Sequence, residues 1–352
     1  MKVFSDYHHS GLYFSFHLLF EERLGWELYR PIGMEWFPQW WDIAKPYGQN
    51  ESTAKQYLEI RDSEPFYAPT DGSPVLNSIV DRKPEHYVIE EIAHGYRQKA
   101  MTFQQFLDTD IDIIVASLPD HWVTYTKLRD MYKPKAKVIC QSGNIFWENE
   151  ELIRSGTVKN LMASTKAFPV PEGVNAVSYH QEQPVIPYKT IKKTMNISSY
   201  VHLLPLPGLY EEYSKALPQY NWRAYGAGCP NGLIHKLSDL YQNIQDSDWV
   251  YNVKPRGDGY GWVWHSAFML GRPVITNASD YRDKLGGELF EDGITGIDLE
   301  KGTVQENALL IKNLCDNDWI QKMGDKARER WEQVVNYDAE FWVLQKFLER
   351  LI

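Results

Sequence analysis

The chain has 352 residues, of which 43% are hydrophobic and 24% are charged, a composition typical of a soluble globular protein with two domains. Its formal net charge of -10 disfavours broad electrostatic binding to nucleic acid or to an anionic membrane surface. The three cysteines are far apart, no signal peptide is expected, and no apolar run approaches the roughly 20 residues that cross a membrane, so we expect a cytoplasmic protein.

The first residues predict the opening of a β-α-β unit, and therefore of a mostly parallel sheet. A strand at the start of the chain leads into a loop that carries Asp6, His8 and His9. A helix with one apolar side follows and ends at Gly25, and residues 26–29 continue as a second strand. This order places the histidine loop directly after the first strand.

Three further buried strands extend this predicted sheet, and they lie at 111–116, 137–140 and 160–164. Asp120 follows the first of them. The region 34–85 is rich in proline, aromatic and acidic residues, and we interpret it as an irregular insertion. Residues 181–196 show little periodicity and predict a linker, so an N-terminal domain spans 1–185.

The strand–helix pattern restarts after the linker, with strands predicted at 200–204, 221–225 and 249–253. A C-terminal domain then spans 197–335, and residues 336–352 form a terminal helix that can cross back to the N-terminal domain. Two consecutive strand–helix runs predict an α/β protein of two doubly wound Rossmann-like domains that face a cleft. Ligands of such sheets bind at the carboxyl ends of the strands.

Residues 254–276 form the most informative segment, because a glycine-rich turn opens a helix that ends at Gly271 before another strand. Such a turn leaves backbone N–H groups that favour a phosphate. Lys254 and Arg256 lie close enough in the sequence to neutralise a diphosphate, although solvated basic residues on a loop are the alternative. From physics alone, an ordinary helix–strand unit explains the pattern equally well.

A wider set of residues carries a resemblance to a known family, and it comprises Asp246, Ser247, Asp248, the strand 249–253, Asp258, Gly259, Tyr260, Gly261, Ser266, Ala267, 271–275 and 292–296. This pattern resembles the nucleotide-sugar-dependent glycosyltransferases of the two-domain GT-B fold. The resemblance implies an enzyme without metal or cofactor that moves a sugar from a nucleotide diphosphate sugar to a hydroxylated acceptor. It also implies that the N-terminal domain is the acceptor side.

The resemblance implies a donor site whose residues are Lys254, Arg256, Gly259, Tyr260, Gly261 and Ser266. The departing phosphate would lie on the glycine-rich turn, and Asp258 would face the hydroxyls of the donor sugar. The family usually carries a carboxylate for the nucleotide ribose where this chain has Ser266, and a serine hydroxyl makes only part of that interaction.

For the catalytic base, the resemblance to inverting GT-B enzymes indicates His8 or His9, oriented by Asp120. A histidine held by a carboxylate is a competent base near neutral pH. A structural histidine pair in a turn is the alternative. His121 and His265 are weaker candidates, and retention or inversion of the sugar configuration stays undecided.

Other functions remain compatible with the sequence. A sugar-nucleotide epimerase or hydrolase would turn over the donor without an acceptor, and a binding protein that has lost catalysis would form no product. A dinucleotide-dependent oxidoreductase is disfavoured because the first loop lacks the glycine pattern of that class. The acceptor can be a glycan, a small molecule or a modified base in DNA, although the net charge disfavours the last.

Overall fold

The computed structural model describes residues 1–5, 10–31, 36, 42–43, 88–89, 96–97, 99–117, 119–142, 150–163, 172–201, 204–226, 228–234, 237–316 and 319–352. The chain forms two compact units. The first contains Met1–Ser164, Phe168–Gln183 and Asp338–Ile352, and the second contains Thr165–Ala167 and Pro184–Tyr337. Most of the predicted insertion at 34–85 lies outside the described residues, as do His8 and His9.

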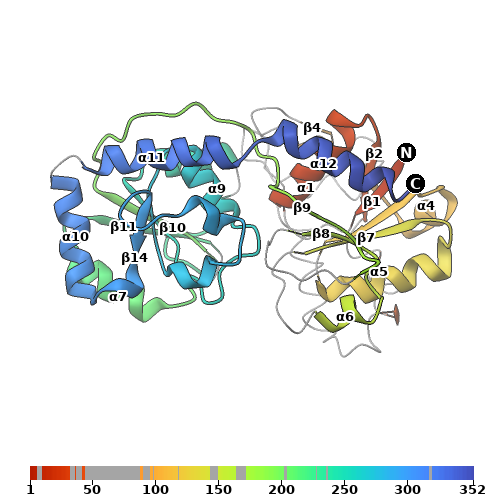
Figure 1. Ribbon diagram of the computed structural model, residues 1–352, viewed down its shortest axis with the longest axis horizontal. Helices are drawn as coiled ribbons and strands as arrows, with labels where there is room; N and C mark the ends of the chain where they lie inside the picture. Colours follow the sequence, from red (N-terminus) through yellow and green to blue (C-terminus); the bar gives the residue numbers. More distant parts are fainter. Residues whose placement is uncertain are drawn as a thin grey trace. The chain divides into compact units, whose positions relative to one another are not determined.

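The first unit is built on a parallel sheet of seven strands in the order β5-β2-β1-β6-β7-β8-β9. Figure 1 labels β1, β2, β7, β8 and β9 of this sheet. The strands are β1 Lys2–Ser5, β2 Glu27–Pro31, β5 Lys99–Met101, β6 Ile113–Ala116, β7 Lys137–Gln141, β8 Asn160–Ala163 and β9 Asn175–Ser178. A separate antiparallel pair joins β3 Val88–Ile89 to β4 Tyr96–Arg97. The order reverses between β1 and β6, which is the topological switch point of a doubly wound sheet.

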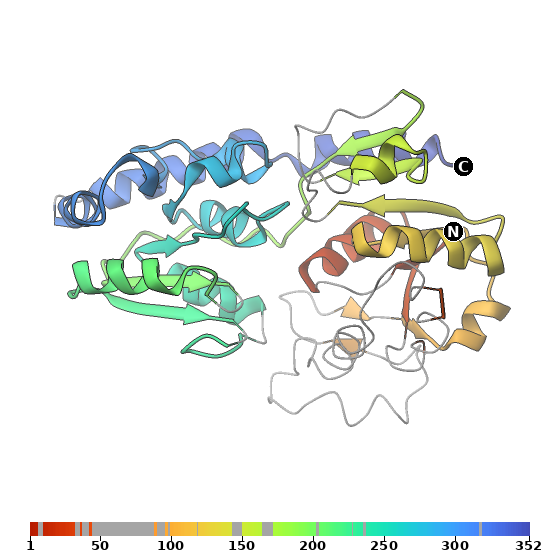
Figure 2. The ribbon, with the colours of Figure 1, turned by 90° about the horizontal axis from the view of Figure 1, so that it is seen from below.

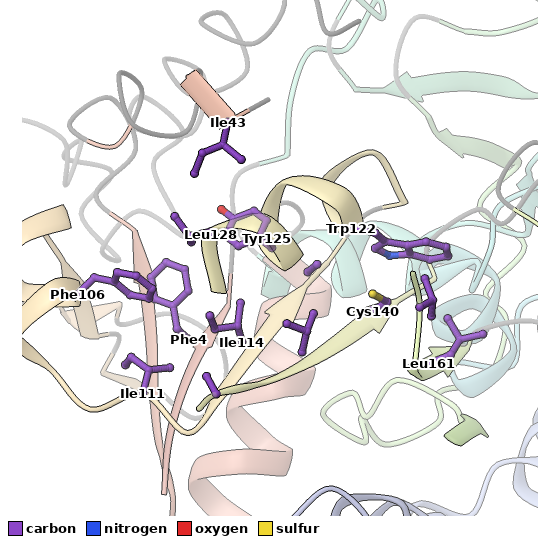
Figure 3. Close-up of a cluster of buried hydrophobic side chains, with 14 of the residues drawn as sticks. Phe4, Ile43, Phe106, Ile111, Ile114, Trp122, Tyr125, Leu128, Cys140 and Leu161 are labelled. Atoms are coloured by element: carbon purple, nitrogen blue, oxygen red, sulfur yellow. The ribbon is translucent and has the colours of Figure 1, made fainter. Parts of the chain in front are cut away.

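The helices of the first unit are α1 Ser10–Phe16, the π-helix η1 His17–Arg23, α4 Phe103–Asp108, α5 Pro119–Tyr132, α6 Glu150–Arg154 and α12 Tyr337–Glu349. Helix α4 begins at a capping box, in which Thr102 and Gln105 satisfy each other's backbone N–H groups. Side chains from β1, β6, β7, β8 and α5 share one apolar core, seen around Ile114 and Trp122 in Figure 3.

The last helix, α12, belongs to the first unit and is held there by charged side chains. Arg23 donates to Glu182 at 2.8 Å and to Asp338 at 2.9 Å, and its guanidinium lies over the ring of Phe341. His180 Nδ1 and Glu340 Oε1 are 2.7 Å apart. These contacts join parts of the unit that are distant in the sequence.

The second unit has a parallel sheet of five strands in the order β11-β10-β12-β13-β14. The strands are β10 Asn196–Tyr200, β11 Asn221–Tyr225, β12 Trp249–Tyr251, β13 Val274–Thr276 and β14 Gly296–Asp298. The helices are α7 Pro207–Ala216, α8 Leu237–Gln245, α9 Trp262–Met269, α10 Val304–Asp316 and α11 Trp319–Val334. Short 3₁₀ turns lie at Ala278–Tyr281 (η6), Gly286–Leu289 (η7) and Leu299–Lys301 (η8).

One apolar core of the second unit lies between its sheet and the helices α7 and α10. Figure 2 shows the ribbon of this unit from a second side. It combines Ile197 and Tyr251 of the strands with Tyr213 of α7 and Ile311 of α10. The two doubly wound sheets confirm the α/β architecture that the sequence predicts.

The predicted position of the first strand in the second unit is wrong. The sequence favours 200–204, whereas β10 spans Asn196–Tyr200. The strand contains two buried serines, and Ser198 is satisfied by a hydroxyl–hydroxyl bond of 2.6 Å with Ser247. Because this bond joins residues that are far apart in the sequence, the local pattern of polar side chains gives no sign of a buried strand.

Candidate functional site

The candidate site is the turn that joins β12 to α9, residues 252–261. Arg256, Gly257 and Gly261 have positive φ angles of 66°, 66° and 74°. Gly261 precedes the first residue of α9, and no side chain caps the helix there. The N-terminus of a helix presents backbone N–H groups, and its dipole favours negative charge there.

The segment after β13 holds this turn in place. The backbone N–H of Arg256 donates to Asp280 Oδ1 at 2.8 Å. A Cβ atom at Gly257 would overlap the carbonyl oxygen of Asp280, so only glycine fits this contact. The hydroxyl of Tyr281 donates to Asp258 Oδ2 at 3.4 Å. Because β12 and β13 are neighbours, their loops meet at the same edge of the sheet and support each other.

Charged side chains surround the acidic residue of the turn. Lys254 Nζ forms an ion pair with Asp258 Oδ1. Burial lowers the pKa of Lys284, and the charges of Asp283, Arg256 and Asp258 also act on this lysine. No local sequence pattern marks Lys284 as a site residue. The order of the strands is the signal that could have found it, since the loop after β13 lies beside the loop after β12.

The predicted donor residues fall into two groups. Lys254, Arg256, Gly259, Tyr260 and Gly261 share the turn, whereas Ser266 lies further along α9. The ring of Tyr260 is buried and stacks on His265, with ring centroids 3.8 Å apart. Ser266 is fully buried, and its hydroxyl donates to the carbonyl of Trp262 at 2.9 Å. The roles of these residues in donor binding stay predictions.

The predicted base residues follow strands of the first unit in the sequence. His8 and His9 lie outside the described residues, and so does the side chain of Asp120, whose backbone belongs to the first turn of α5. The described strands before them are neighbours, because Ser5 of β1 pairs with Val115 of β6. The two predicted segments therefore follow adjacent strands at the switch point. The pairing itself stays a prediction.

Two other histidines in the first unit contact carboxylates, and the sequence analysis does not name either of them. His17 and Glu21 lie 2.7 Å apart within the π-helix, at a spacing of four residues that the sequence itself displays. His180 contacts Glu340 and follows β9, which is the edge strand of the sheet. Neither histidine follows a strand at the switch point, so we assign both pairs to the packing of the unit.

Within the described part of the chain, no three histidine, cysteine, aspartate or glutamate side chains lie together in a way that could hold a metal ion. Among the same residues, no helix has the length and apolar character that crossing a membrane requires.

No protein-family model and no curated protein sequence matches the chain. Solved structures do match it in fold. HepE of Anabaena, crystallised with UDP and glucose, has a TM-score of 0.60 at 14% identity, and the match covers 99% of this chain and 100% of that one. Sucrose-phosphate synthase of Thermosynechococcus elongatus gives 0.61 at 11% identity, with 100% and 99% covered.

A glycosyltransferase of Rickettsia africae gives a TM-score of 0.56 at 12% identity, with 99% of this chain and 98% of that one covered. Each of these matches extends over nearly the whole chain. Sequence identities this low show the fold alone. The predicted GT-B fold is therefore confirmed.

Proposed function

We propose that the chain is a glycosyltransferase that moves a sugar from a nucleotide diphosphate sugar to a hydroxylated acceptor. The observation that carries the proposal is the uncapped start of α9, preceded by a turn with Lys254, Arg256 and Asp258 at the carboxyl edge of a doubly wound sheet. The shared fold with HepE, whose crystal contains UDP and glucose, makes UDP-glucose the first donor to test.

The chemistry of the proposed site follows from its charges. Breaking the bond between the sugar and the diphosphate places extra negative charge on the leaving group, and the helix dipole with Lys254 and Arg256 would stabilise it. In the structure Lys254 is paired with Asp258. A diphosphate would compete for Lys254, and the released carboxylate of Asp258 could then accept a hydrogen bond from a sugar hydroxyl. These groups supply charge without a metal or a cofactor.

The acceptor side of the proposal rests on the first unit. His8 or His9 would remove the proton of the acceptor hydroxyl, with Asp120 orienting the ring. The support for this pairing is that their segments follow the adjacent strands β1 and β6. The acceptor itself can be a glycan, a small molecule or a modified base in DNA.

We also propose a reducing, cytoplasmic setting for the protein. Cys140, Cys229 and Cys315 are all buried and take part in no disulfide, which is usual for proteins in reducing compartments.

A donor-binding protein without catalysis is the second candidate function. The bond between the hydroxyl of Ser266 and the carbonyl of Trp262 favours it, because this hydroxyl is then engaged within the helix at the position where the family holds the ribose. Binding of a nucleotide without product from any acceptor would identify this case.

A thermal-shift panel of UDP, GDP, ADP and their hexose conjugates tests the proposal. We expect one nucleotide family to raise the melting temperature, and Arg256→Ala to reduce that response. Arg330→Ala is the matched control, because Arg330 belongs to the same unit and donates to the carbonyl of Glu288 on η7. If no nucleotide shifts the wild-type protein, the proposed function is wrong.

The proposed base has its own test once an active donor and acceptor are known. Replacing the catalytic histidine should lower turnover by about a hundredfold or more, because general-base catalysis contributes roughly that factor. We expect this loss in either His8→Ala or His9→Ala. Full turnover in both variants would remove the histidines from the mechanism.

A further inference from the structure

Asn252 is the residue between β12 and the turn, and both polar atoms of its side chain are buried. The residue is fully buried, and neither Oδ1 nor Nδ2 of its amide has a hydrogen-bond partner. Its backbone is fully used: the N–H donates to Ile275 at 2.9 Å, and the carbonyl accepts from Thr276 Oγ1 at 2.8 Å. The backbone is therefore fixed while the amide is unsatisfied.

The alternation of side chains along the strand places this amide on the side of α9. Tyr251 and Val253, on either side of Asn252, belong to the apolar core shared with α7 and α10. Consecutive residues of an extended strand point to opposite faces, so Asn252 points away from that core. Helix α9 packs against the neighbouring strand β13, outside that core. The amide thus lies on the same face as the helix that the turn opens.

Trp249, Tyr251 and Ser199 also carry a buried polar atom without a partner, but one atom each, whereas Asn252 leaves both a donor and an acceptor unpaired. Two further polar residues close to this strand are satisfied. Asp248 accepts from the backbone N–H groups of Thr194 and Met195 at 2.8 Å, and Ser198 pairs with Ser247. A buried amide without partners destabilises a protein, and a leucine of similar shape would not carry that penalty. We therefore expect the amide of Asn252 to form its hydrogen bonds with a bound ligand.

We propose that Asn252 binds a hydroxyl group of the donor sugar. A hydroxyl can donate to Oδ1 and accept from Nδ2, so it satisfies both halves of the amide. A phosphate oxygen only accepts, and it would leave Oδ1 unpaired. Asp258, in the same turn, would serve as a second acceptor for the sugar. This assignment rests on the proposed function. It specifies that the residue after β12 contacts the sugar of the donor and not its diphosphate.

Access to the amide involves the turn, because Asn252 is covered in the structure. The ion pair between Lys254 and Asp258 spans the turn directly after it. A diphosphate that attracts Lys254 would weaken this ion pair, and opening the turn would bring the sugar to Asn252. If the diphosphate binds first and the sugar reaches Asn252 only afterwards, a nucleoside diphosphate without a sugar should bind without contacting the amide.

The test is Asn252→Leu, with UDP and UDP-glucose as the two probes; if the panel selects another base, the same pair with that base is used. We expect a melting temperature without nucleotide that is equal to or above that of the wild type, because the unsatisfied amide is gone. We expect UDP to bind within about twofold of the wild type and UDP-glucose to bind about tenfold more weakly, the loss of one or two hydrogen bonds.

Ser199→Ala is the matched control. Ser199 Oγ is also buried without a partner, on the neighbouring strand β10. It lies on the opposite face, since Ile197 of the same strand belongs to the core with α7. This variant should leave both affinities unchanged. Should Asn252→Leu fail to fold, Asn252→Ala gives the same comparison of UDP with UDP-glucose.

Two results would overturn the assignment. Equal weakening of UDP and UDP-glucose would place the amide on the phosphates, and unchanged affinity for both would assign it to a buried water. Either result leaves the proposed function standing, because the wild type would still bind the donor. Failure of the wild type to bind any nucleotide is a separate result that removes the proposed function itself.

Discussion

Both units are doubly wound, but different kinds of contact stabilise each of them internally. In the first unit, Arg23 and His180 reach side chains of α12 that come from the end of the chain. In the second unit, the turn at 252–261 is held by Asp280 and Tyr281, which follow the next strand. Long-range charged contacts therefore stabilise the first unit, whereas the candidate donor site depends on short-range backbone fit. A single substitution should therefore change either the stability of the first unit or the donor site of the second unit, but not both.

The largest loss of stability is expected at Gly257, where a positive φ angle and a close contact with the backbone of Asp280 both exclude a side chain. Gly257→Ala introduces a Cβ atom against the carbonyl of Asp280 at a positive φ angle. We expect a loss of about 2 kcal/mol or more in the free energy of unfolding, together with weaker UDP binding. Urea unfolding and a binding titration measure the two quantities.

Gly293→Ala is the control for backbone strain alone. Gly293 has a φ angle of 75° and open space around a Cβ atom. This variant should lose only about 1 kcal/mol and bind UDP normally. If Gly257→Ala and Gly293→Ala behave alike, the contact with Asp280 does not shape the site.

A smaller effect is expected from Arg23→Ala, which removes the contacts with Glu182, Asp338 and the ring of Phe341. We expect a loss of about 1–2 kcal/mol in unfolding free energy, between the values for exposed and buried ion pairs. UDP affinity should not change, because these contacts lie in the first unit. Arg350→Ala, an exposed arginine at the end of α12, should cost little in either measurement.

The smallest effect concerns pH. Burial lowers the pKa of Lys284 below the value of 10.5 usual for lysine, while burial raises the pKa of Tyr281, so that phenol stays neutral. If Lys284 assists the diphosphate, UDP affinity should be constant near pH 7 and fall roughly two- to threefold as the pH rises through the lowered pKa. Lys284→Arg should keep its affinity to a higher pH. An identical pH profile for both proteins would remove Lys284 from the site.

The sequence predicts the parts of the fold that local pattern determines. The apolar run of β6 and the glycine-rich turn before α9 can both be recognised in the sequence, and both appear in the structure. The start of β10 cannot be recognised in the sequence, because the hydroxyl of the buried Ser198 forms its hydrogen bond with Ser247, far along the chain. Arg272 is a similar case. It is fully buried and donates to the carbonyls of Gln245, Lys189 and Leu270, which no sequence pattern announces.

The candidate site shows the same division. Lys254, Arg256 and Asp258 can be read from one continuous segment. Lys284 and Asn252 can be recognised only after the strand order and the pattern of buried, unpartnered atoms are known. The contact between two loops and the solvation of one amide are properties of the folded chain, so no local pattern of residues predicts them.

Hydrogen exchange measured by mass spectrometry, with and without saturating UDP, tests whether the turn at 252–261 binds the diphosphate of the donor. We expect slower exchange of backbone N–H groups in peptides that cover 252–266, with smaller protection in 278–284 and unchanged exchange in β6 and β7. These segments are the turn, the start of α9 and the loop that supports them. Protection confined to the first unit, in a protein that does bind UDP, would contradict the assignment of the donor site to this turn.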